Sequence, residues 1–258
     1  MPQIPTTRIK GLELPRILIG TNSLLGWSHT SRGRDEWIRR TFGADRVAEV
    51  LMHCARQGAN AVVGPLFPRL VDALAKARAM GARITWVSTT VGGSKDTFKE
   101  QLAQIRDAGS PICFLHGAWT DRWPLVDGRL EKLEEYVEAI REAGMIPGTA
   151  VHNAERLALV TKLGYDFDAY LVPVNKAGFT MHPDRETMLK AVAEAGKPVI
   201  AIKPLACGRF DEGKPGEWLR WTLEQRGVVA TAIGVMCEEE ADEDLAAAQE
   251  IFAAPASA

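Results

Sequence analysis

Residues 194–203 read EAGKPVIAIK, and this stretch decides the fold. A helix-like segment reaches Gly196, and a short apolar run from Val199 to Ile202 follows it. Glycine just past a helix end readily adopts the left-handed backbone conformation that terminates a helix. A short run of Val, Ile, Leu and Ala is typical of a strand buried in a parallel sheet. The stretch therefore predicts a helix that passes through a glycine into a buried strand.

The same joint recurs along the chain. It appears six more times, as RQGANAVVG at Gly58, AMGARITWV at Gly81, DAGSPICFL at Gly109, EAGMIPGTA at Gly144, KLGYDFDAYLV at Gly164 and QRGVVATAIG at Gly227. The opening run RILIG, about residues 16–20, adds a strand that no long helix precedes. Eight strands alternating with helices make a (β/α)₈ barrel, which takes about 250 residues as one unit. We therefore expect residues 1–258 to form a single-domain α/β TIM barrel.

The composition indicates an ordinary globular protein. The formal net charge is −2 and 46% of the residues are apolar, so no basic excess points to a nucleic-acid partner. No apolar run approaches the roughly 18 residues of a membrane span, and the first residues contain no apolar signal core. The four cysteines form no CxxC pair. We expect a cytoplasmic protein with a small-molecule partner and neither a nucleic-acid nor a membrane partner, and the oligomeric state stays open.

A short strip of residues, polar in most cases, follows each predicted strand. In order, the strips are Thr21 and Asn22; Gly64 and Pro65; Thr89 and Thr90; His116; His152 and Asn153; Asn175 and Lys176; Lys203; and residues 234–237. In TIM barrels the reacting groups lie at the C-terminal ends of the strands and in the loops that follow. We therefore predict one site at this end, where Thr21, Asn22, His152, Asn153 and Asn175 bind substrate.

The first connection, about residues 22–44, is longer than the roughly 2 to 6 residues usual between a strand and a helix. It carries His29 and Arg32, which offer a titratable group and an anion donor. We predict a long loop that either covers the mouth or packs as a flap on it. His29, Arg32 and, after the seventh strand, Arg209 complete the predicted substrate-binding set.

Three side chains are the predicted catalytic groups. His116 would act as a general acid/base or polarise a substrate oxygen. Lys203 and Lys176 would stabilise an oxyanion, attack a carbonyl as Schiff-base nucleophiles, or serve as ordinary cations for an anionic substrate. A bound divalent metal is a further alternative, with His116 and His152 as its first ligands, although no predicted strand ends in Asp or Glu.

Several stretches resemble aldo-keto reductases in the same order along the chain. These are LPRILIGTNSLLG near the start, PICFLHGAWTD, YLVPVNKAGF, and VIAIKPLACGRF followed by VVATAIGVMCEEEADEDLAAAQEIF. The resemblance implies a barrel and an NADPH-dependent carbonyl reductase with catalytic Asp, Tyr, Lys and His. Only the histidine is carried over, onto His116.

The sequence departs from that family at the other three catalytic positions. AVVGPLFPRLVDAL lacks the expected Asp and Tyr, and Thr replaces the expected Lys in VSTTV. After the eighth strand, where the family binds the adenosine phosphate, the chain is acidic from Glu238 to Asp244. Such residues suit the start of a helix but would repel a 2′-phosphate. The cofactor is therefore left open between NADPH, a divalent metal and none.

Three functions remain in view. The first is a divergent aldo-keto reductase-like enzyme that acts on a small polar carbonyl or sugar-like compound through His116. The second is a lyase, aldolase or isomerase that uses Lys176, Lys203 or a histidine-bound metal. The third is a small-molecule binding protein that has kept the barrel without catalysis.

Overall fold

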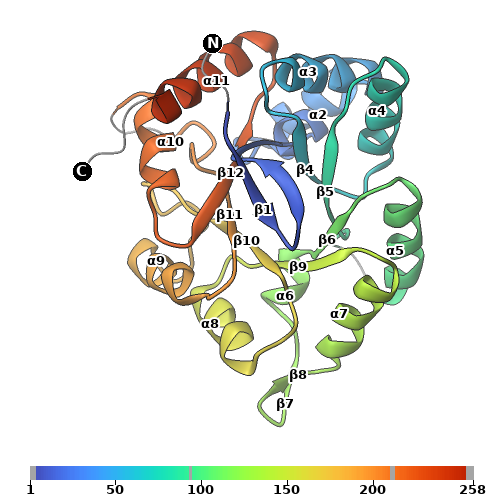
Figure 1. Cartoon of the computed structure of the whole chain (residues 1–258), viewed down its shortest axis with the longest axis vertical. Helices are drawn as coiled ribbons and strands as arrows, with labels where there is room; N and C mark the ends of the chain where they lie inside the picture. Colours follow the sequence, from blue (N-terminus) through green and yellow to red (C-terminus); the bar gives the residue numbers. More distant parts are fainter. Residues whose placement is uncertain (1–3, 93–94, 210–212, 254–258) are drawn as a thin grey trace.

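The computed structural model describes residues 4–92, 95–209 and 213–253. Residues 1–3, 93–94, 210–212 and 254–258 of the expected 1–258 domain lie outside the described residues. Eight parallel strands close into a barrel (Figure 1). They are β3 (Ile17–Gly20), β4 (Ala61–Pro65), β5 (Thr85–Thr89), β6 (Ile112–Leu115), β9 (Ile146–Ala150), β10 (Ala169–Pro173), β11 (Val199–Ile202) and β12 (Val228–Gly234). The predicted single-domain α/β barrel is confirmed.

Helices surround the barrel and alternate with its strands (Figure 1). They are α3 (Ala44–Arg56), α4 (Pro68–Ala79), α5 (Phe98–Asp107), α7 (Leu133–Glu142), α8 (Ala154–Leu163), α9 (Arg185–Glu194), α10 (Pro215–Leu223) and α11 (Glu238–Ala253). All seven joint glycines have φ between +65° and +95°, a range that side chains with a Cβ rarely adopt. The joint thus ends each preceding helix or turn in the way the sequence predicts.

The side chains along each barrel strand point alternately into the barrel and toward the helices, so they contribute to two separate apolar regions. In β3 the side chain of Leu18 belongs to the cluster inside the barrel, whereas Ile17 and Ile19 belong to the cluster between strands and helices. All three side chains are almost completely buried. Side chains of successive strand residues point to opposite faces, so one short run fills both regions.

A hairpin that the sequence analysis did not predict closes the N-terminal end of the barrel. Strands β1 (Thr6–Ile9) and β2 (Leu12–Pro15) pair antiparallel, and Lys10 and Gly11 form the turn with φ of 49° and 86°. Figure 1 shows β1 across the centre of the barrel. Ile9 and Leu14 are fully buried in the interior cluster. The barrel is plugged at this end, which leaves the opposite end for a ligand.

The first connection differs from the expected long loop over about residues 22–44. It contains α1 (Asn22–Leu25) and α2 (Arg32–Thr41). Ser31 caps α2 by accepting a hydrogen bond from the Arg34 N–H at 3.2 Å. Of the helix's ten residues only Ile38 is buried, so its sequence lacks the apolar stripe by which an amphipathic helix is recognised.

Short elements also interrupt two later connections. The 3₁₀ helix η1 (Lys95–Thr97) precedes α5, and α6 (Gly117–Thr120) follows β6. Strands β7 (Leu125–Val126) and β8 (Arg129–Leu130) then form a small hairpin before α7. No helix in the described parts of the chain has the length and apolar character needed to cross a bilayer.

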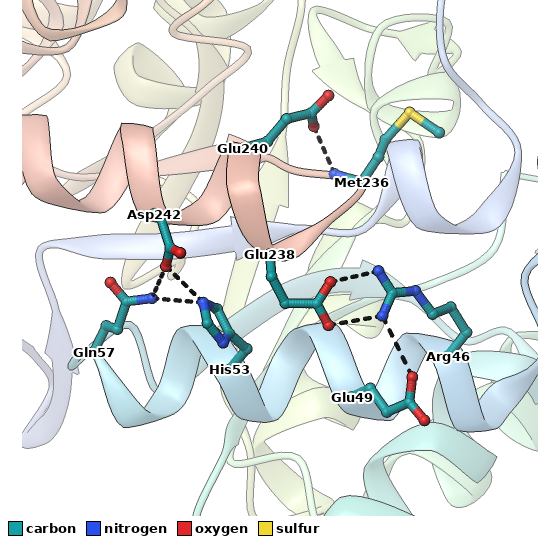
Figure 2. A network of polar contacts seen from close by, with 8 residues as sticks. All are labelled: Arg46, Glu49, His53, Gln57, Met236, Glu238, Glu240 and Asp242. Carbon is teal, nitrogen blue, oxygen red and sulfur yellow. Dashed lines mark hydrogen bonds and ion pairs between the residues drawn. The ribbon is translucent and has the colours of Figure 1, made fainter.

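A polar network joins α3 to the start of α11 (Figure 2). Two nitrogens of Arg46 donate to the carboxylate of Glu238, at 2.7 and 2.5 Å. His53 lies 2.6 Å from Asp242. His53 therefore has a structural partner on the outside of the barrel, and two of the acidic residues of α11 are engaged in packing the helices together.

Candidate functional site

A cavity of about 1160 Å³ opens at the C-terminal ends of the strands. This volume exceeds that of most ligand pockets, which measure roughly 300–1,000 Å³. The predicted site residues that line it are Thr21, Asn22, His29, His116, His152, Asn153 and Lys203. They come from the ends of β3, β6, β9 and β11 and from the first connection. The structure therefore brings most of the predicted set together.

Asp121 and His152 form the best-defined pair in the cavity. His152 follows β9, and its Nδ1 lies 3.0 Å from Oδ2 of Asp121. The other oxygen of Asp121 accepts from the backbone N–H of His152 at 2.9 Å. Since a carboxylate accepts hydrogen bonds, this arrangement places the imidazole proton on Nδ1 and leaves Nε2 as an acceptor.

Lys203 faces that acceptor. Its Nζ lies 3.5 Å from Nε2 of His152, at the limit of a hydrogen bond. Burial lowers the pKa of Lys203, and the nearby Cys207 and Asp121 oppose this shift. No carboxylate of the described residues lies within ion-pair distance of Nζ. Lys203 also has φ of +58°, a strained conformation for a residue with a long side chain.

His116 takes part in a different contact. It caps α6, and its Nδ1 accepts from the backbone N–H of Ala118 at 3.1 Å. Burial, followed by the charges of His152 and Lys203, lowers the pKa of His116 to about 4. The imidazole is therefore neutral near pH 7 and carries its proton on Nε2, as a hydrogen-bond donor.

Two glycines make room for these imidazoles. A Cβ added to Gly117 would lie 2.6 Å from Nδ1 and Cε1 of His152, and one added to Gly92 would lie 2.9 Å from Cε1 of His116. Real Cβ atoms do not approach that closely. Both positions lack a side chain because a ring occupies the space.

His29 holds the first connection against the later part of the barrel. The amide nitrogen of Asn22 lies 3.2 Å from Nε2 of His29. Burial, then the charges of Lys203 and Arg209, lowers the pKa of His29 to about 4. The guanidinium of Arg209 donates to the carbonyl of His29 and lies 4.1 Å from the centre of the Phe179 ring.

Four predicted site residues are not among the described residues that line the cavity: Arg32, Asn175, Lys176 and Arg209. Arg32 is exposed on α2 and pairs with Glu36 at 2.9 Å. Asn175 is fully buried, and its side chain bonds the backbone of Phe179 at 2.8 and 3.0 Å. Arg32 and Asn175 thus have structural partners, and the substrate-binding and catalytic roles of the four residues stay predictions.

Two of the lining residues also have structural partners. The hydroxyl of Thr21 donates to the carbonyl of Val63 at 3.1 Å. The side chain of Asn153 caps α8 by accepting from the N–H of Arg156 at 3.0 Å. Their side chains are therefore already engaged on the protein side of the cavity.

The cavity wall includes residues that the sequence analysis missed or could not orient. Asp121, His182 and Cys207 lie near the basic groups, and Glu240, Glu243 and Asp244 of α11 add carboxylates. The direction of the Asp121 side chain could not be predicted from sequence because α6, which turns it toward His152, is only four residues long. Nothing in the periodicity of α11 marks Asp244 as a residue that lines a ligand cavity.

The predicted metal ligands, His116 and His152, both line the cavity. One ring nitrogen of each is engaged, by Ala118 and by Asp121 respectively. Across residues 4–92, 95–209 and 213–253, no group of three or more His, Cys, Asp or Glu side chains is arranged to hold a metal ion.

The fold and the position of the cavity define a parallel barrel of the type found in aldo-keto reductases. An aldo/keto reductase from Brucella melitensis matches with a TM-score of 0.64 and 13% identity, over 97% of this chain and 99% of that chain. An aldo-keto reductase from Bacillus halodurans matches with a TM-score of 0.64 and 14% identity, over 99% and 93%.

A complex of Gox0644 with NADPH matches with a TM-score of 0.65 and 14% identity, over 96% of this chain and 88% of that chain. At these identities the likeness shows the fold. No family model and no curated protein matches the sequence.

Proposed function

We propose that the cavity is the active site of an enzyme that acts on the carbonyl group of a small polar or sugar-like compound, with Lys203 as a Schiff-base nucleophile. The observation that carries the proposal is the array of Lys203, His152 and Asp121, in which Nζ lies 3.5 Å from Nε2 and Nδ1 lies 3.0 Å from the carboxylate. A nucleophile beside a base that a third group orients is a recurring arrangement in covalent catalysis.

The state of Lys203 supports this role over that of an ordinary cation. An amine attacks a carbonyl only in its neutral form, and burial lowers the pKa of Lys203 toward that form. A cation kept for structure alone would be expected to have a carboxylate partner when removed from water. Lys203 instead faces Nε2 of His152, at 3.5 Å.

The residues can carry out each proton transfer of Schiff-base formation. Neutral Nζ attacks the carbonyl carbon, the C–N bond forms, and the carbonyl electron pair moves onto oxygen. His152 Nε2 takes the proton that Nζ loses, and Asp121 stabilises the resulting imidazolium. The imidazolium then protonates the alkoxide, which gives a carbinolamine and restores neutral His152. A second proton, taken from solvent water through His152, protonates the hydroxyl group; the C–O bond breaks, water leaves, and an iminium ion remains on Lys203.

His116 is placed to assist without changing its own charge. Because Nδ1 accepts from Ala118, the Nε2–H of His116 is a hydrogen-bond donor, and preorganised donors of this kind stabilise charge that develops on a carbonyl oxygen. A pKa of about 4 makes neutral polarisation the better role for His116 than the general acid/base role expected from the sequence. An iminium ion withdraws electrons from the adjacent carbon, so the reaction would belong to the lyase, aldolase or isomerase class.

The residues of α11 do not fit NADPH, the cofactor that the likeness to aldo-keto reductases implies. Glu240, Glu243 and Asp244 line the cavity, and Asp244 is buried. A 2′-phosphate placed beside these carboxylates would be repelled, although Arg34 lies on the same wall. NADPH therefore takes no part in the proposed reaction.

Carbonyl reduction remains the second candidate because the fold matches aldo-keto reductases over nearly the whole chain. Oxidation of NADPH or NADH that depends on an added carbonyl compound, and that is lost in His116→Ala, would support carbonyl reduction.

Covalent trapping of a carbonyl substrate on Lys203 by borohydride tests the first proposal. A ligand that binds and is recovered unchanged, with neither result, would favour a noncatalytic binding protein.

A further inference from the structure

Three of the six acidic residues from Glu238 to Asp244, at the start of α11, have partners that stabilise the fold. Glu238 and Asp242 face α3, where Arg46 and His53 are their partners (Figure 2). Glu240 accepts from the backbone N–H of Met236 at 2.8 Å, as a helix-capping carboxylate does. These contacts explain three of the carboxylates by the stability of the fold. They do not explain Glu243 and Asp244.

Asp244 is the unusual member. Asp244 is only 7% exposed, and it lines the cavity. No hydrogen bond or ion pair joins its carboxyl group to any of the described residues. Buried carboxylates in proteins are normally paired or hydrogen-bonded, since an isolated buried charge is strongly unfavourable. The carboxyl group of Asp244 has no partner within the described residues and lies on a cavity wall, so it is open to a partner from the ligand.

The surroundings of Asp244 make that partner a cation. The charged groups that act on it are Glu243 and Glu240, and together they raise its pKa, after burial, to about 7. Both are exposed at the rim of the same cavity. Arg34 also lines the cavity but lies beside Met236, where its guanidinium contacts the sulfur. The three carboxylates thus leave this side of the cavity with an excess of negative charge.

We propose that Asp244, with Glu243 and Glu240 at the rim, binds an ammonium group of the ligand, so that the substrate is a small amino-carbonyl compound of the amino-sugar type. The substrate class rests on the proposed carbonyl chemistry, whereas the ammonium site does not. Divalent hard metals prefer six or more oxygen ligands, more than one buried carboxyl group with two rim carboxylates would supply. An organic ammonium ion needs only one or two charge-assisted hydrogen bonds.

Lys203 and Asp244 follow neighbouring strands of the barrel, so we propose that one ligand contacts both. Strand β12, which precedes α11, pairs with β11, and Lys203 follows β11 directly. Both Lys203 and Asp244 line the same cavity. Because both residues line one cavity, the proposed ligand carries a carbonyl group for Lys203 and an ammonium group for Asp244.

The test compares matched amine and hydroxyl ligands on the full chain by calorimetry and thermal shift. The pairs are D-glucosamine and D-glucose, aminoacetone and hydroxyacetone, and ethanolamine and ethylene glycol, at equal ionic strength. At least one amine should bind about tenfold more tightly than its hydroxyl counterpart, as expected for a charge-assisted contact in a partly dry site. Equal binding within all three pairs would overturn the proposal.

Asp244→Asn keeps the shape of the side chain and removes its charge. The amine preference should fall to about twofold or less in Asp244→Asn, and by a smaller factor in Glu243→Gln. Glu250→Gln, an exposed acidic position on the same helix, should keep the full preference. An amine preference that survives in Asp244→Asn would overturn the site, as would Mg²⁺ that stabilises the protein and displaces the amine.

The result separates the two proposals. Amine selectivity that depends on Asp244, found without any adduct on Lys203, would support the ammonium site and contradict the Schiff-base function. An adduct on Lys203 without amine selectivity would do the reverse.

Discussion

Nζ of Lys203 lies 3.5 Å from Nε2 of His152, although the two residues follow different strands and are 51 positions apart in the sequence. The contact exists because β11 and β9 flank β10 in the closed barrel. It connects a desolvated amine to an imidazole whose other nitrogen lies beside Asp121. Asp244, a residue of α11, lines the same cavity as this array.

Asp121→Asn should slow formation of a Lys203 adduct by about 10²- to 10⁴-fold, because an amide can reverse the tautomer of His152 and leave Nε2 protonated. The melting temperature should change little. Adduct formation with the best carbonyl substrate, followed by intact mass against time, measures the rate. Asp107→Asn, at an exposed surface position, is the matched control and should keep the original rate. An unchanged rate in Asp121→Asn would remove Asp121 from the array.

Gly117→Ala should displace the imidazole of His152, because the new Cβ would lie 2.6 Å from its ring atoms. We expect at least a tenfold slower reaction of Lys203, with destabilisation of about 1–3 kcal/mol from the overpacked site. Gly33→Ala is the control, since nothing lies within 4 Å of a Cβ there. That substitution, in the exposed helix α2, should stabilise the protein by about 0.5–1 kcal/mol. Chemical denaturation and the adduct rate together check both variants.

Asp244→Asn should stabilise the unliganded protein at alkaline pH. Burial raises the pKa of Asp244 from 3.8 to about 7, so the unfolded chain loses this proton first and stability falls as the pH rises between these values. Above pH 7, the free energy of unfolding of the variant should therefore exceed that of the original chain by up to about 4 kcal/mol. Below pH 3.8 this effect of the carboxyl group should vanish. Melting curves from pH 4 to 9 test the sign. A variant that is less stable at pH 8 would show that the charged carboxylate has a stabilising partner.

His116→Asn should make the protein less sensitive to acid. The pKa of His116 is lowered to about 4, so protonation favours the unfolded chain, and stability that is complete above pH 6.5 is lost as the pH falls toward 4. Asparagine can still cap α6 and does not titrate. Between pH 6.5 and pH 4, the free energy of unfolding should fall by about 1–3 kcal/mol less in the variant than in the original chain. An imidazole resonance of His116 that titrates near pH 6.5 in nuclear magnetic resonance spectra would contradict the burial effect.

The barrel could be predicted from local sequence because each joint is a local event. A glycine such as Gly196 ends its helix without reference to the rest of the chain, and the apolar run after it has no other buried position to take. The N-terminal hairpin was missed because its strands have four residues each. Their burial depends on the barrel interior, which the hairpin sequence alone does not reveal.

The site was only partly predictable because strand register decides which side chains reach the cavity. Pro173 pairs with Ile202, so Lys203 follows its strand directly, whereas Lys176 comes three residues after Pro173. The chain has turned by then, where Asn175 bonds to Phe179. Two lysines that look alike in sequence thus have different positions. The pairing of Asp121 with His152 depends in the same way on contacts across 31 residues.

Borohydride trapping tests the central proposal most directly. The full chain is incubated with small aldehydes, ketones and amino sugars, reduced, and examined by intact mass and peptide mapping. Lys203 should carry the adduct well above the level of other lysines. Lys203→Arg should lose it, and Lys176→Arg, which changes a lysine outside the described cavity lining, should retain it. Modification of Lys203 no greater than that of exposed lysines across the whole panel would contradict the Schiff-base function.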